Sequence, residues 1–138
     1  MIDRRKTEEL LPLMEVAFAA GGYFRLYPSG RSMLPLLREG IDSVLLSRPD
    51  VIRRGDILLV RAEHGFLLHR AIAVNDDGIT LCGDALTVTE GPFPETAVIA
   101  RVVRIYRGER PIDPSSLGQR VYAARRALRR RIRHLLKH

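Results

Sequence analysis

Residues 66–82, FLLHRAIAVNDDGITLC, decide the fold. Phe66–Val74 is an apolar run with the composition of a strand, and Ile79–Cys82 is a second, shorter run. Between them, Asn75-Asp76-Asp77-Gly78 is typical of a hairpin turn, because Asn, Asp and Gly accept the positive φ angles that such turns require. The stretch therefore predicts two paired antiparallel strands.

Further short apolar runs on both sides extend this hairpin into a sheet. The other expected strands are Tyr23–Tyr27, Ser43–Ser47, Asp56–Arg61 and Thr96–Arg107. The segment Glu90–Glu95 contains Pro92 and Pro94 and is expected to be a loop.

Residues 7–20 have the pattern of a short amphipathic helix. Thr7 is the expected N-cap, and Gly21-Gly22 is the expected end. Pro12 fits this helix only if it lies in the first turn, because a proline further along removes a hydrogen bond.

The C-terminal residues form a second amphipathic pattern, which begins after the helix-start signal Asp113-Pro114. Its apolar residues recur at steps of three and four: Leu117, Val121, Ala124, Leu128, Ile132 and Leu135. We therefore expect an N-terminal helix over 1–21, a mostly β domain over 22–112 and a basic amphipathic helix over 113–138.

Composition places the chain among soluble globular proteins. It has 138 residues, which favours one domain, and its one cysteine, Cys82, excludes an internal disulfide framework. No apolar run approaches the roughly 20 residues that span a bilayer. The charged N-terminus predicts no secretory leader, so we expect the cytoplasm as the compartment.

The net charge of +7 is unevenly distributed. Residues 115–138 contain seven Arg, one Lys and no acid, a charge of +8. The rest holds 15 cations and 16 acids, a charge of −1. Nucleic acid is therefore an unfavoured partner for the β domain, and any interaction with a polyanion concerns the tail alone.

Ser32 and His69 are the residues best suited to nucleophilic chemistry. Ser32 lies in a Gly-containing bend, where a hydroxyl is exposed beside backbone N–H groups that could hold an oxyanion. The same pattern is typical of an ST-turn or a helix cap. His69 interrupts an apolar strand, where an imidazole can act as a general base or simply be a satisfied core residue.

Asp84 and Glu90 are the acids that could support His69. Asp84 ends the strand that pairs back through the hairpin, so it lies near His69 and is the first choice. Glu90 follows six residues later on a loop that could fold back towards the ring. No Gly-rich phosphate loop and no His/Cys set with metal-ligand spacing occurs, so we expect no cofactor and no metal.

Five sequence blocks, in this order, resemble the signal-peptidase and LexA-type superfamily of serine peptidases. The blocks are Gly30-Arg31-Ser32-Met33-Leu34-Pro35, Gly40-Ile41-Asp42, Gly55-Asp56-Ile57-Leu58-Leu59, Leu68-His69-Arg70-Ala71 and Gly83-Asp84. They cover nearly the whole β domain. The resemblance implies the small bent β-sheet or partial barrel of that fold, to which the residue patterns add a helix at each end.

The resemblance also implies roles for individual residues. Ser32 matches the nucleophile before Met, and His69 matches the general base of the Ser-His members, just before Arg70. Asp84 matches the Gly-Asp block, and Glu90 stands where a further Asp is expected. Gly30 departs from the family, which often has Ser there to help the oxyanion hole.

Two functions follow from these expectations. The first is a serine endopeptidase with Ser32, His69 and Asp84 or Glu90, acting on a dedicated peptide or protein. The second is a catalytically inactive signal-peptidase-like module, favoured by Gly30, whose tail engages a membrane, a protein partner or nucleic acid. An arginine-covered tail with one apolar stripe would suit peripheral attachment to the inner face of the membrane or to a membrane protein.

Overall fold

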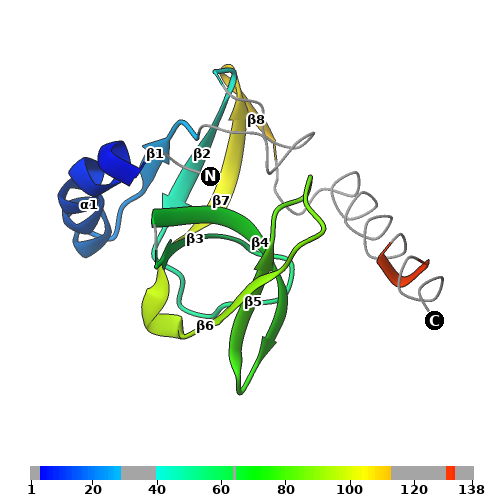
Figure 1. The fold of residues 1–138 in the computed structure, drawn as a ribbon. Helices are drawn as coiled ribbons and strands as arrows, with labels where there is room; N and C mark the ends of the chain where they lie inside the picture. The colour runs from blue at the N-terminus through cyan, green and yellow to red at the C-terminus, as the bar shows by residue number, and fades with distance from the viewer. Residues whose placement is uncertain (1–3, 29–39, 64, 113–129, 133–138) are drawn as a thin grey trace.

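The computed structural model describes residues 4–28, 40–63, 65–112 and 130–132. It shows a mostly β protein with one short N-terminal helix (Figure 1). The elements are α1 (Arg4–Ala19), β1 (Phe24–Leu26), β2 (Asp42–Ser47), β3 (Ile57–Ala62), β4 (Gly65–Asn75), β5 (Gly78–Cys82), β6 (Glu90–Phe93), the 3-10 turn η1 (Glu95–Ala97), β7 (Val98–Arg107) and β8 (Arg110–Ile112).

All eight strands belong to one antiparallel sheet with the order β1-β2-β7-β3-β4-β5-β6. The ten-residue strand β7 pairs with three other strands. One of its edges pairs with β2, and its other edge pairs first with β3 and then, nearer its end, with β8. The predicted hairpin is confirmed: Asn75 pairs with Gly78, and the Asp77 N–H donates to Asn75 Oδ1 at 2.9 Å.

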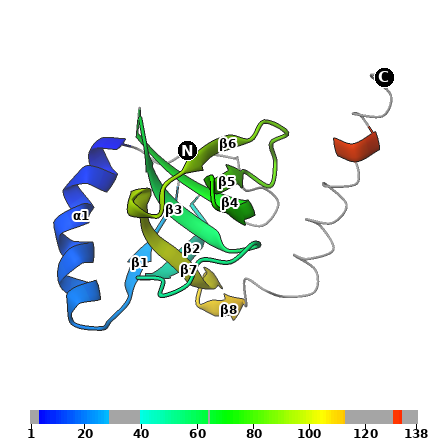
Figure 2. The same cartoon turned by 90° about the horizontal axis from the view of Figure 1, so that it is seen from below.

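Most of the buried apolar side chains in the described ranges form two groups on opposite faces of β3. Ile57 and Leu59 join the first group, which α1 covers with Met14 and Phe18. The second group contains Leu58, Val60, Ala71, Ile79 and Leu81. Because successive side chains in a strand point to opposite faces, the first four residues of β3, Ile57–Val60, are buried on both sides, and they are accordingly all apolar. Figure 2 shows α1 along one side of the sheet.

Helix α1 ends as expected and begins earlier than expected. Gly21 has φ +75°, and its N–H donates to Phe18 O, while the Gly22 N–H donates to Ala17 O. These two bonds form a Schellman motif. The prediction for Thr7 was wrong, because the helix begins at Arg4 and Thr7 is a fully buried residue within it. Pro12 also lies beyond the first turn, inside the helix.

Two strands were not predicted. The expected loop Glu90–Glu95 contains β6, and the prediction failed because its prolines argue locally against a strand. Pairing with β5 outweighs that preference. The three-residue β8 is too short to leave a pattern of its own. Most of the expected C-terminal helix lies outside the described residues, although 130–132 are helical.

Strands β5 and β6 approach each other so closely that glycine is required on both. A Cβ on Gly78, where φ is +124°, would lie 2.5 Å from the carbonyl oxygen of Phe93. A Cβ on Gly91, where φ is +109°, would lie 2.7 Å from the carbonyl oxygen of Ile79. This approach fixes the position of β6 and therefore of its first residue, Glu90.

Gly78→Ala should lower the free energy of unfolding by about 2–4 kcal/mol, because it combines backbone strain with a clash against β6. Gly108→Ala is the matched control: φ there is +64°, but a Cβ would meet nothing within 4 Å. It should cost only about 1 kcal/mol. Urea denaturation of both variants measures the difference, and equal losses would show that β5 and β6 are not closely packed.

Candidate functional site

His69 is held in the middle of β4 by the alternation of that strand. Phe66 and Leu68 point into the first group of buried side chains, so His69 shares the opposite face with Ala71. Its cross-strand neighbour is Leu58 of β3, and only 2% of His69 is exposed. A polar ring in such surroundings needs polar contacts to offset the loss of water.

Glu90 reaches this ring from β6. Its Oε1 atom lies 2.6 Å from Nδ1 of His69, and 29% of the Glu90 side chain remains exposed. Glu90 is paired with Leu81 of β5, whose neighbour on β4 is Ala71. The sheet order β4-β5-β6 thus brings together two residues that are 21 positions apart in the sequence.

The surroundings of His69 favour its neutral form. Burial lowers the pKa of His69 from its ordinary value of 6.5, because the charged ring is poorly solvated there. The negative charge of Glu90, the short contact between its carboxylate and the ring, and the charge of Asp84 oppose this effect without cancelling it. The balance of these effects favours the neutral ring over the charged one.

Asp84 forms an ion pair with Arg70. Both oxygens of its carboxylate accept hydrogen bonds, from Nε and Nη2 of Arg70, at 2.9 Å each. Nη1 of Arg70 also donates to the carbonyl oxygen of Gly55 at 3.0 Å. The Arg70 and Asp84 side chains are 9% and 5% exposed, so this is a buried bidentate ion pair that joins the loop before β3 to the end of β5.

The predicted site residues therefore have different surroundings. His69 and Glu90 lie together, whereas Asp84 is bound to Arg70 beside them. Ser32, the predicted nucleophile, lies outside the described residues. Sequence reasoning missed the contact between Arg70 and Asp84, although the hairpin register contained the signal: Arg70 pairs with Cys82, and Asp84 follows two positions later on the same face.

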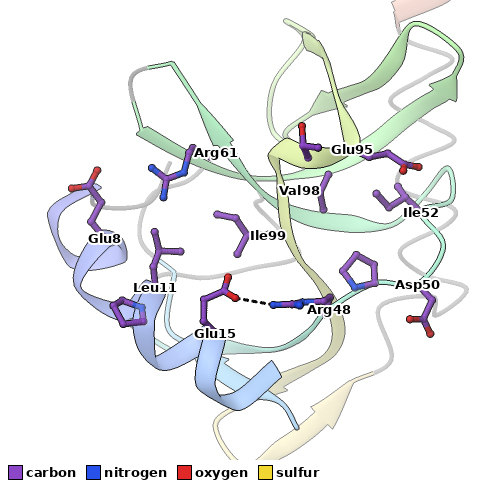
Figure 3. A pocket seen from close by; sticks show the side chains of 13 residues that line it. Glu8, Leu11, Glu15, Arg48, Asp50, Ile52, Arg61, Glu95, Val98 and Ile99 are labelled. Atoms are coloured by element: carbon purple, nitrogen blue, oxygen red, sulfur yellow. Dashed lines mark hydrogen bonds and ion pairs between the residues drawn. The ribbon is translucent and has the colours of Figure 1, made fainter. Parts of the chain in front are cut away.

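A groove of about 760 Å³ lies elsewhere, between α1, the segment after β2 and the start of β7 (Figure 3). The groove is not lined by His69, Arg70, Asp84 or Glu90. Within the described ranges, no group of three or more His, Cys, Asp or Glu residues could hold a metal ion. No helix in the described part of the chain is long and apolar enough to cross a membrane.

Comparisons with protein-family models, with curated proteins and with solved structures found no match.

The lowered pKa of His69 should make stability depend on pH. Below pH 6.5 the unfolded chain binds a proton at this histidine more readily than the folded chain, so the contribution of His69 to the free energy of unfolding decreases as the pH falls. We expect urea denaturation between pH 8 and 5 to show a steeper loss for the wild type than for His69→Gln. An equal loss, or an NMR titration of His69 above 6.5, would contradict this prediction.

Proposed function

We propose that the chain is a serine endopeptidase that resembles signal peptidases, with Ser32 as nucleophile, His69 as general base and Glu90 as the acid that supports the base. One observation carries the proposal: a buried histidine with a lowered pKa has a carboxylate oxygen 2.6 Å from Nδ1. The order of the sequence blocks supports it independently. The finer fold, a bent sheet of the signal-peptidase and LexA type, is part of the same proposal, and burial of β3 on both faces supports it.

The chemistry follows from the two nitrogens of the ring. The Glu90 carboxylate beside Nδ1 favours the tautomer with its proton on that nitrogen, which puts the lone pair on Nε2. Nε2 takes the proton of the Ser32 hydroxyl as its oxygen attacks the peptide carbonyl, and later gives that proton to the leaving amine. The imidazolium that forms between these steps is stabilised by Glu90. Water then hydrolyses the acyl-enzyme by the same route, which regenerates both residues.

Arg70 and Asp84 act on this site as positioning residues. Their ion pair anchors the β4–β5 hairpin at its open end, where His69 lies one residue from Arg70. Asp84 also contributes a negative charge that favours the imidazolium, although its oxygens are bound by Arg70. Of the two candidate acids, Glu90 is therefore the one proposed to support the ring, through its contact with Nδ1.

The test is digestion of a proteome-derived peptide library by the full chain, with new peptide ends identified by mass spectrometry. Wild type should produce a defined set of ends that Ser32→Ala does not produce. His69→Gln should slow their appearance at least about a thousandfold, because it removes the base. Glu90→Gln should slow it at least about tenfold, because the neutral amide cannot stabilise the imidazolium.

Two matched variants control for nonspecific effects. Ser47→Ala changes a serine of β2, and Glu109→Gln changes an exposed acid of the turn before β8; both should cleave as wild type does. If wild type and Ser32→Ala give the same ends, Ser32 is not the nucleophile of a peptidase, the proposal is wrong, and a non-catalytic module becomes the favoured function.

A further inference from the structure

The groove between α1 and η1 has an apolar floor and a charged rim (Figure 3). Its floor is half-buried and consists of Leu11, Ile52, Val98 and Ile99. Its rim carries four exposed carboxylates and two exposed guanidinium groups, a net charge of −2: Glu8, Glu15, Asp50, Glu95, Arg48 and Arg61. Such a surface is complementary to a peptide segment that presents both apolar and cationic side chains.

The two arginines of the rim already have partners in the groove or beside it. Arg48 donates to Oε2 of Glu15 at 2.8 Å, and the guanidinium of Arg61 lies 5.0 Å from the centre of the Phe66 ring. Asp50 and Glu95 come from other elements, and Figure 3 shows them on the side of the groove away from α1. A cationic segment would therefore meet carboxylates on both sides of an apolar floor.

The chain itself contains a segment of this chemistry. Residues 115–138 carry a charge of +8 and a stripe of apolar residues, whereas the remainder carries −1. Within this segment the structure describes 130–132, which are helical, and 47% of Ile132 is exposed. Figures 1 and 2 show these three residues on the opposite side of the molecule from α1, so they do not cover the groove of their own chain.

We propose that the groove binds the C-terminal segment of a second copy of the chain. The contact is heterologous, because a tail of one copy meets a groove of the next, and a heterologous contact that does not close into a ring gives open assemblies. Exposed ion pairs contribute little individually, so affinity requires several of them together with burial of the apolar stripe. Association should therefore be weak, concentration-dependent and sensitive to salt. This proposal does not depend on the peptidase chemistry.

The first test is sedimentation velocity of the full chain over a range of concentrations, at about 50 mM and about 500 mM salt, which shortens the Debye length from above 10 Å to below 8 Å. Wild type should associate beyond the monomer at low salt and dissociate at high salt. The double variant Asp50→Arg and Glu95→Arg should raise the dissociation constant at least about tenfold, because it puts like charges together. The matched control, Asp76→Arg with Asp77→Arg, changes the same number of charges in the exposed β4–β5 turn and should associate normally.

The second test identifies the contact itself. Lys6 and Lys137 are the two lysines of the chain, so the segment 115–138 has one side-chain amine, that of Lys137. A carbodiimide joins an amine to a carboxylate without a spacer, so its products show which carboxylates Lys137 contacts. In a mixture of isotopically light and heavy chains, we expect links from Lys137 of one copy to Asp50, Glu95 or Glu8 of another. A monomer at every concentration at low salt, association unchanged by the groove variant, or links only within one chain would overturn the proposal.

Discussion

A histidine in the middle of a sheet is costly unless its ring finds polar contacts, and the Glu90 carboxylate provides one at 2.6 Å. Three strands position the two residues of this contact. Strand β4 buries His69, the β4–β5 hairpin carries β6 alongside, and the close approach of β5 to β6 sets where Glu90 begins its strand. Burial and the carboxylate act oppositely on the pKa of the ring, and burial prevails.

The Arg70–Asp84 pair is the second constraint on the same region. Removing one partner from a buried ion pair leaves an uncompensated charge, which typically costs about 3–5 kcal/mol. The pair between Arg48 and Glu15 differs, since those side chains are 56% and 62% exposed and solvent screens them. The buried pair therefore fixes the open end of the hairpin beside His69, whereas the exposed pair only shapes the rim of the groove.

The elements that could be predicted from the sequence are those with local causes. The hairpin follows from Asn75–Gly78 and its flanking apolar runs, and the helix end follows from Gly21-Gly22. Strand β6 could not be predicted in this way, because its prolines argue against a strand and the connection 83–89 has no turn signal that announces its pairing with β5.

The site could also be predicted only in part, namely where a residue carries a local sequence signal. His69 could be identified as a chemically unusual residue of an apolar strand, and its two candidate acids could be named. Choosing between them depends on which face each side chain occupies. Arg70 and His69 are adjacent and point to opposite faces, so Asp84 contacts Arg70 while Glu90, from a strand that was not expected, contacts His69. The nucleophile assigned to Ser32 stays a prediction.

The protonation state of the His69 ring tests the central claim most directly. Two-dimensional long-range ¹H–¹⁵N NMR at pH 7.5 distinguishes the two neutral tautomers and the imidazolium through the chemical shifts of the two ring nitrogens. A neutral ring with its proton on Nδ1, towards Glu90, is the predicted result. A proton on Nε2 alone, or a ring protonated on both nitrogens at this pH, would contradict the assignment of His69 as a general base supported by Glu90.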